Sequence, residues 1–125
     1  MELRRFKKED LKTINGWYAA HGMRGLSEDE LPSTGLIIPD VAANFLYLTD
    51  SSIGFIENFI ANPHASMFDI ALALEETTKH FLMMAAQLKR TKIFALTRRN
   101  SITKRVERVG FKNHGPWNML SMEVH

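Results

Sequence analysis

The sequence predicts an α+β domain in which helices flank a mixed β-sheet. β-rich runs alternate with amphipathic helical stretches along the 125 residues, and residues 67–74 (MFDIALAL) are almost continuously apolar, as in a strand buried on both faces. A strand, a helix and a further strand follow near the end, and such a crossover requires a right-handed parallel pairing. A chain of this length supports one hydrophobic core, so we expect a single domain over residues 1–125.

The first forty residues predict one strand, one helix and a long connection. Residues 2–6 alternate as a short strand, and apolar side chains then recur at close to helical spacing from Leu11 to His21, where a glycine ends the helix. Glycine, proline and serine interrupt every period in residues 22–40. We therefore expect an irregular connection there, with a short helix at residues 27–31.

The middle of the chain predicts a hairpin and then a central strand. Residues 41–49 and 53–60 are β-rich runs joined by Asp50-Ser51-Ser52, which predicts an antiparallel pair. After a turn at Asn62-Pro63-His64, the apolar run at residues 67–74 is expected in the middle of the sheet.

A helix and a parallel strand are expected next. Thr77 is a plausible N-cap for a helix whose apolar stripe includes Phe81 and Met84. Residues 92–98 (KIFALTR) predict a strand. We expect it to lie beside residues 67–74 in parallel, with the two strands diverging at their C-terminal ends.

One more helix and two strands complete the predicted fold. Asn100 is placed to cap a helix that Gly110 ends. Phe111 then begins a return strand, and residues 117–124 alternate weakly, as in a final edge strand paired with the one before it.

The composition excludes several kinds of chemistry. The chain has no cysteine, which rules out disulfides, thiolate nucleophiles and thiolate metal sites. Its five histidines have neither the i,i+4 nor the His-x-His spacing of a metal site, so no metal is expected. No apolar run approaches the ~20 residues that span a bilayer, and the chain starts without a signal peptide, so we expect a cytoplasmic protein with no membrane partner.

Charge is distributed unevenly along the chain. Residues 1–78 hold six Lys and Arg against twelve Asp and Glu, whereas residues 79–125 hold ten against two. Such a concentration of positive charge attracts the phosphates of a nucleotide cofactor or of a nucleic acid, and solvated helix faces are the simpler alternative. Nucleic acid is the weaker partner, because Phe94 is the only aromatic residue among the late basic residues that could stack on bases. Those residues are Lys89, Arg90, Arg98, Arg99, Lys104, Arg105 and Arg108.

Residues 100–111 (NSITKRVERVGF) resemble the last helix of the GNAT superfamily, the N-acyltransferases that use acetyl-CoA. The positions that look like the family pattern are Asn100, Ile102, Val106, Glu107, Gly110 and Phe111. The opening strand and helix and the hairpin match as well, so the resemblance covers the whole chain loosely and its last third more closely. It implies a GNAT-like twisted sheet, mostly antiparallel with a parallel central pair. The small size and short termini also resemble GNAT-like proteins of bacteriophages.

The resemblance implies an acetyl-CoA site at the end of the central strand. GNAT members bind the CoA pyrophosphate with a Gln/Arg-x-x-Gly-x-Gly/Ala loop, whereas residues 75–80 (EETTKH) at that place contain no glycine and carry two carboxylates that repel a phosphate. The tyrosine that often serves as general acid in the family is replaced by Val106. The expected cofactor contacts are Leu72, Leu74, Thr77, Thr78, Lys79, His80, Asn100 and Arg105.

Two acids are candidates for the catalytic base that amine acetylation requires. Glu57 lies in the second hairpin strand and Asp69 in the apolar run at residues 67–74, and burial would raise the pKa of either carboxyl group. We favour Glu57, because its strand faces the cleft of a GNAT fold more readily than the middle of a doubly buried strand does. The simpler alternatives are a solvated Glu57 and an Asp69 that bonds to backbone or to an arginine.

Three functions remain open from the sequence. The favoured one is an N-acetyltransferase that acts on the amine of a small molecule or a protein, with residues 22–40 shaping the acceptor pocket, and it rests on the family resemblance. The first alternative is a catalytically inactive GNAT-fold protein with a binding or structural role in a phage. The second is a small basic module for nucleic acid. The sequence does not fix the acceptor or the oligomeric state.

Overall fold

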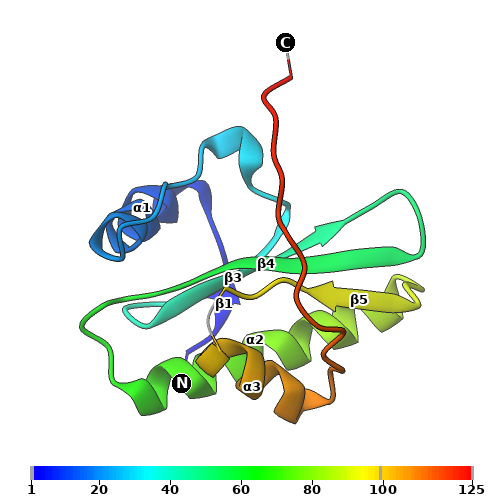
Figure 1. The fold of residues 1–125 in the computed structure, drawn as a ribbon. Coiled ribbons are helices and arrows are strands. Elements are labelled where there is room, and N and C mark those ends of the chain that lie inside the picture. Colours follow the sequence, from blue (N-terminus) through cyan, green and yellow to red (C-terminus); the bar gives the residue numbers. More distant parts are fainter. Residues whose placement is uncertain (1, 99, 125) are drawn as a thin grey trace.

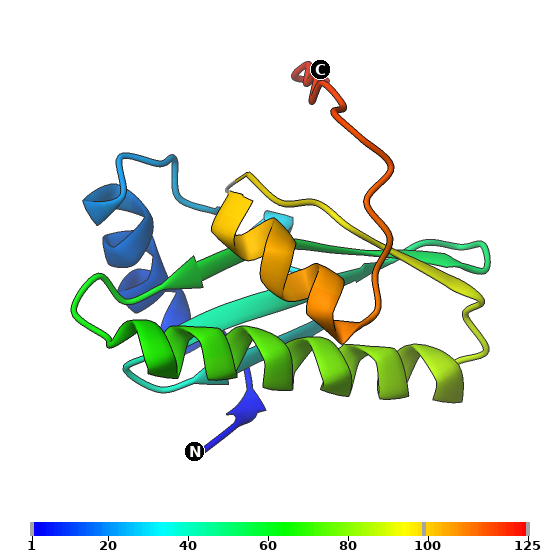
Figure 2. The same cartoon turned by 60° about the horizontal axis from the view of Figure 1, so that its bottom comes forward.

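The computed structural model describes residues 2–98 and 100–124. A twisted sheet carries helix α1 on one face and helices α2 and α3 on the other (Figures 1 and 2). The strands are β1 (Arg4–Arg5), β2 (Thr34–Ile38), β3 (Ala42–Leu48), β4 (Ile53–Ala61) and β5 (Lys92–Ala95). The helices are α1 (Leu11–Ala20), α2 (Met67–Gln87) and α3 (Asn100–Val109), with short 3₁₀ helices η1 (Lys8–Asp10) and η2 (Glu28–Glu30). No helix in the described ranges has the length and apolar character needed to cross a membrane.

The sheet is mixed, as the sequence predicts. Its strands lie in the order β1-β2-β3-β4-β5, and every neighbouring pair is antiparallel except β4 and β5, which are parallel. The α+β class, mostly antiparallel with one parallel pair, is therefore confirmed. The predicted hairpin is present as β3 and β4, and β5 begins at Lys92 as expected.

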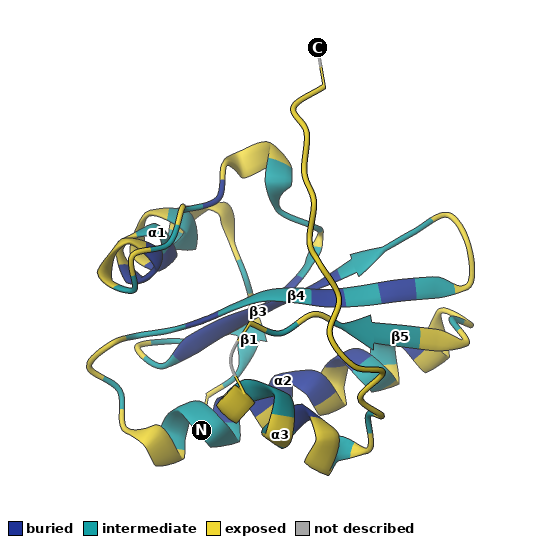
Figure 3. Ribbon diagram, viewed as in Figure 1, coloured by how far each residue is buried: buried dark blue, intermediate teal, exposed yellow. Residues whose placement is uncertain are grey.

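Alternate strand residues pack into two apolar cores, one on each face of the sheet. Phe45 of β3 packs on one side with Trp17 and Tyr18 of α1. Its neighbour Leu46 packs on the other side with Phe81 of α2, because successive side chains of a strand point to opposite faces. Figure 3 shows the buried sides of α1 and α2 turned toward the sheet, and the last residues of the chain fully exposed.

The predicted central strand at residues 67–74 is wrong, because these residues form the first turns of α2. Ser66 is the N-cap, and its hydroxyl accepts a hydrogen bond from the Asp69 N–H at 3.1 Å. Thr77, predicted as the cap, is fully buried in mid-helix, where its hydroxyl donates to the Ala73 carbonyl at 2.8 Å. An apolar run of eight residues does not distinguish a buried strand from a buried helix face. The strand that lies parallel to β5 is β4.

Two further expectations about strands are corrected. β2 lies inside the connection expected to be irregular. Gly35 within the strand and Pro39 after it interrupt the pattern that would indicate a strand. Gly35 is required there, because an added Cβ would lie 2.9 Å from the ring of Phe45. The short helix expected in the same connection is confirmed as η2. The strands expected at Phe111 and at residues 117–124 do not form among the described residues, whereas α3 ends before Gly110 as predicted.

Candidate active-site cleft

A cleft opens where β4 and β5 separate. The two strands pair from Ile53–Ile56 with Lys92–Ala95, and one further bond joins the Leu96 N–H to the Ile56 carbonyl at 2.9 Å. Beyond that point β4 continues to Ala61, while the chain after β5 turns toward α3. The splay expected at the C-terminal ends of a parallel pair is therefore present, with β4 as one of its strands.

The cleft has a volume of about 500 Å³ and mostly apolar walls. β4 contributes Glu57 and Asn58 to its floor, and the starts of α2 and α3 contribute side chains such as Met67 and Ile102. His21 closes the side at the end of α1, where its Nε2 lies 3.1 Å from the Ala61 carbonyl. The remaining lining residues are Met23, Phe59, Ile60, Ala61, Asn62, Pro63, Ala65, Ile70, Leu96, Thr97, Arg98, Ser101 and Met119.

A β-bulge shapes β4 beside the cleft. The register with β3 shifts between Ala43 and Phe45, and Asn58 has a left-handed φ of 65°. Tyr18 donates its hydroxyl proton to the Asn58 carbonyl at 2.5 Å, and the Asn58 side-chain amide donates to the Tyr47 hydroxyl at 2.9 Å. Burial raises the pKa of both phenols, so both are neutral at physiological pH. These two contacts hold the strand in its bulged conformation.

Glu57 lies next to the bulge and lines the cleft, as the sequence predicts. It is half-buried and pairs across the strands with Phe45 of β3. Asp69, the second candidate acid, is not buried in a strand. It lies in the first turn of α2, where a carboxylate stabilises the positive end of the helix dipole.

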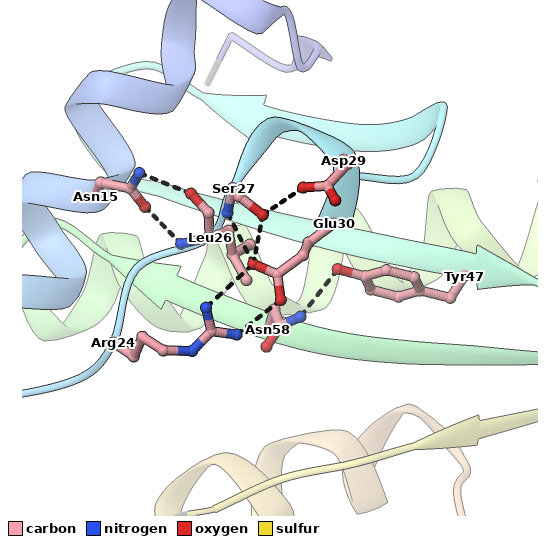
Figure 4. Close-up of polar contacts among 8 residues, drawn as sticks. All are labelled: Asn15, Arg24, Leu26, Ser27, Asp29, Glu30, Tyr47 and Asn58. Carbon is pink, nitrogen blue, oxygen red and sulfur yellow. Dashed lines mark hydrogen bonds and ion pairs between the residues drawn. The ribbon is translucent and has the colours of Figure 1, made fainter. Parts of the chain in front are cut away.

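The segment before η2 is held rigidly near the bulge (Figure 4). Arg24 forms a two-pronged ion pair with Glu30, at 2.7 and 3.2 Å, and Glu30 also accepts from the Ser27 N–H at 2.8 Å. The Arg24 guanidinium, with the Ser27 donors, lowers the pKa of Glu30 to about 2. Asn15 of α1 exchanges two hydrogen bonds with the Leu26 backbone, which ties this segment to α1.

The start of α2 is the place in the cleft wall that suits an anion. Of the first N–H groups of the helix, that of Asp69 is taken by the Ser66 hydroxyl, while those of Met67 and Phe68 have no partner assigned among the described residues. In the loop before the helix, the N–H groups of His64 and Ala65 are both taken by Asn62. The loop before α2 contains no glycine, and neither do residues 75–80, where the sequence placed the pyrophosphate loop.

The structure does not bring the predicted cofactor contacts together. Residues 75–80 are not a loop, and their side chains lie along α2 away from the residues that line the cleft. Lys79 pairs with Glu75 at 2.9 Å, and the His80 ring lies 2.9 Å from the Glu76 carbonyl. Leu72 is half-buried, and the side chains packed under the sheet are Leu74, Thr77 and Thr78. Because these residues form a helix and not a loop, residues 72–80 lie outside the cleft.

The remaining predicted contacts lie on α3. Asn100 is exposed at its first turn, next to Ser101 in the cleft wall, and Arg105 is half-buried further along. Of the late basic residues, Arg98 also lines the cleft, whereas Arg99 lies outside the described residues. Val106, which replaces the family's tyrosine, is buried and faces a different cavity.

Comparison with solved structures identifies the fold. A variant of TTHA1254 from Thermus thermophilus superposes with a TM-score of 0.72 at 13% identity, over 100% of this chain and 98% of that one. A putative acetyltransferase from Agrobacterium tumefaciens gives 0.71 at 16% identity, over 98% and 100%. The chain has the GNAT fold. No protein-family model and no curated protein matches its sequence.

One GNAT-fold neighbour has been solved with CoA. Rv2747 from Mycobacterium tuberculosis, solved in complex with CoA and NLQ, gives a TM-score of 0.68 at 18% identity, over 86% of this chain and 70% of that one. The cleft of this chain has apolar walls, and the open N–H groups of Met67 and Phe68 lie at its α2 end in the same turn as the Asp69 carboxylate.

Proposed function

We propose that this chain is an N-acetyltransferase that moves an acetyl group from acetyl-CoA to an amine. The observation that carries the proposal is the cleft between β4 and β5, which brings Glu57, the bulged backbone of β4 and the start of α2 to one place. Bound acetyl-CoA would supply the acetyl group as a thioester. The protein has to hold that group, polarise its carbonyl and remove a proton from the amine.

The start of α2 and the apolar cleft walls would bind acetyl-CoA. The N–H groups of Met67 and Phe68, at the positive end of the α2 dipole, are the donors for the pyrophosphate. The half of the cleft between Ile70 and Leu96 is apolar enough for the pantetheine arm.

The backbone of β4 would polarise the thioester carbonyl. Past Ile56 this strand has no neighbour on the β5 side among the residues that the structure describes, and the bulge leaves an extra residue unpaired on the β3 side. Backbone N–H groups that are fixed before the reaction stabilise the charge that develops on a carbonyl oxygen. Tyr18 and Tyr47 hold that backbone through Asn58.

Proton removal falls to Glu57. Its carboxylate lines the cleft beside the bulge, within reach of an amine that approaches from the α1 side. His21 lies on the same side, but its Nε2 contacts the Ala61 carbonyl. A carbonyl only accepts, so that nitrogen carries a proton and is not the base. His21 and Met23 line the cleft on this side, where the amine of a small molecule or of a protein side chain would enter.

A catalytically inactive GNAT-fold protein is the second candidate, and the α2 loop favours it. Asn62 takes the N–H groups of His64 and Ala65 in the loop before α2, and the Asp69 carboxylate puts a negative charge in the first turn of the helix. A binding protein that has kept the scaffold would show these features without loss of function.

Two measurements separate the candidates. Calorimetric titration with acetyl-CoA tests binding, and release of the CoA thiol with a panel of amines, followed with a thiol reagent, tests turnover. The chain has no cysteine, so the reagent gives no background from the protein. Binding with amine-dependent thiol release supports the acetyltransferase. Binding without turnover supports the inactive scaffold, and the absence of binding contradicts the acetyltransferase.

A further inference from the structure

The Glu57 side chain lies on the same face of the sheet as α1. Glu57 pairs across the strands with Phe45, and directly opposite residues of an antiparallel pair point to one face. Phe45 packs with Trp17 and Tyr18 of α1, whereas α2 and α3 cover the opposite face (Figures 1 and 2). The carboxylate is therefore on the side of the cleft where an acceptor would enter.

Arg98, in the turn before α3, lies near the same side of the cleft. Burial raises the pKa of the Tyr18 phenol, the Arg98 guanidinium opposes that rise, and the Glu57 carboxylate adds to it. Both charges have to lie near the Tyr18 hydroxyl to act on it, because the interaction between charges weakens with distance. Since this hydroxyl donates to the Asn58 carbonyl, both charges lie close to the bulge of β4.

The cleft therefore presents one negative and one positive group to a ligand. In the described ranges, Glu57 is the only acid and Arg98 the only arginine or lysine that line it. No ion pair assigned in that part of the chain uses either side chain. The lining also includes the apolar side chains of Met23, Ile102 and Met119. A ligand that matches this surface has a cationic group, an anionic group and an apolar body.

We propose that the acceptor is a free amino acid with an apolar side chain, whose amine lies at Glu57 and whose carboxylate lies at Arg98. This inference rests on the proposed function, because it names the acceptor of the same site. A guanidinium binds a carboxylate through two parallel hydrogen bonds. A ligand held at both ends presents its amine in one orientation, which a simple alkyl amine does not.

The transfer then yields an N-acetyl amino acid and CoA. The amine nitrogen forms a bond to the acetyl carbon, and the bond between that carbon and sulfur breaks. The ammonium loses two protons in this step. One goes to Glu57 and from there to water, and the other leaves with the thiol sulfur, while the carboxylate at Arg98 is unchanged.

Calorimetric titration, with and without CoA, tests the acceptor class. The probes are leucine, methionine and phenylalanine, each compared with its own carboxamide, which keeps the amine and the side chain but has no carboxylate. We expect at least one amino acid to bind about tenfold more tightly than its carboxamide, the effect of one hydrogen-bonded ion pair.

Arg98→Gln should remove this preference. It should weaken binding of the amino acid about tenfold and leave the carboxamide unchanged. Arg98 is exposed, so the substitution leaves the cores intact, and circular dichroism verifies the fold. Arg5→Gln is the matched control, because it removes the same charge from β1 at the opposite edge of the sheet. It should keep the preference of the parent.

Thiol release with the same compounds separates this inference from the proposed function. A preference that depends on Arg98 supports the ligand class even where no thiol is released, in which case the acetyltransferase fails. Equally fast release with the carboxamides overturns the acceptor class and leaves the acetyltransferase intact. Three further results overturn the class: equal affinities for acid and carboxamide, no binding up to about 10 mM, above the ~1 mM upper end of ordinary KM values, and an Arg98→Gln variant that weakens CoA binding alone.

Discussion

Glu57 and Asn58 are neighbours in β4, and the position of Glu57 depends on how the backbone of Asn58 is held. Asn58 is held through its carbonyl by Tyr18 and through its amide by Tyr47, so the backbone next to Glu57 has little freedom. Both phenols are buried enough for their pKa values to rise, which keeps them protonated and Tyr18 a donor. If Glu57 is the base, this fixed backbone holds its side chain in one position for the reaction.

Glu57→Gln should lower kcat/KM about 10²–10⁴-fold at pH 7, the usual contribution of a positioned base. The loss should shrink as the pH approaches the ~10.4 pKa of an alkyl amine, where the acceptor loses its proton without help. Thiol release measured from pH 7 to pH 10 gives both values.

Asp50→Asn is the matched control for that substitution. It removes the same charge at the exposed turn between β3 and β4, away from the residues that line the cleft. Its kcat/KM should equal that of the parent. Equal activity of Glu57→Gln and the parent at pH 7 would remove Glu57 from the mechanism.

Glu30→Gln should reduce stability at neutral pH but not in acid. The folded pKa of Glu30 is about 2, below its ordinary value of 4.5, because Arg24 and the Ser27 donors stabilise the carboxylate. A lowered pKa contributes stability above pH 4.5 that is lost as the pH falls toward 2. Glu30 is partly exposed, so we expect only about 0.5–1 kcal/mol at pH 7.

Urea unfolding of the parent and of Glu30→Gln at pH 7 and at pH 2 measures the difference in their free energies of unfolding. Glutamine can still accept from an N–H at this position, so the substitution removes the charge and leaves the cap. Glu28→Gln, which removes an exposed ion pair with Lys8, is the control and should cost less. A gap between Glu30→Gln and the parent that persists at pH 2 would contradict the assignment of the stability to this carboxylate.

At the scale of elements, α2 explains both what the sequence predicted and what it did not. Its buried residues recur at helical spacing only when residues 67–74 are joined to the stripe that follows, from Thr77 to Ala85. Residues 67–74 on their own are too short and too apolar to show a period. The fold class survives this error, because β4 occupies the place given to the misassigned strand.

The sequence predicts the positions of the site residues that lie in the hairpin. It does not predict those that depend on where α2 begins. The place of Glu57 beside the cleft follows from the hairpin, which the sequence predicts correctly, and its role as the base stays a prediction. Asn58 carried a signal that went unused, since two adjacent polar residues in IENFI break strand alternation and indicate a bulge. His21 carried none, because its place in the cleft comes from tertiary packing. The cofactor contacts in residues 72–80 followed the misplaced strand.

Asp69→Asn should have opposite effects on acetyl-CoA binding and on stability. Removing a negative charge from the first turn of α2 should tighten phosphate binding about two- to fivefold and cost the fold ~0.3–1 kcal/mol, because the carboxylate no longer complements the helix dipole. Calorimetry and urea unfolding measure the two effects.

Glu75→Gln is the control for Asp69→Asn on the same helix. Glu75 lies further along α2 and pairs with Lys79, so its removal should leave acetyl-CoA affinity unchanged. Tighter binding by Glu75→Gln, with no change for Asp69→Asn, would place the phosphates away from the start of α2.

At the scale of the whole molecule, positive charge gathers on α3, which carries Lys104, Arg105 and Arg108. The acidic residues of the first part of the chain lie on both faces of the sheet, in η2 on one face and on α2 beside α3 on the other (Figure 1). α3 begins at the cleft, so a phosphate-bearing ligand that enters there meets a positive field along this helix.

Arg105→Gln should therefore weaken acetyl-CoA binding about two- to fivefold at low ionic strength, the effect expected of one partly exposed charge. The difference should disappear near 1 M salt, where the screening length falls to about 3 Å. Lys12→Gln removes an exposed charge from α1 on the opposite face and should not change affinity at either salt concentration. Calorimetric titrations at the two salt concentrations measure all three proteins. Equal losses in Arg105→Gln and Lys12→Gln would show that net charge attracts the cofactor, and no loss in either would separate the α3 charges from CoA binding.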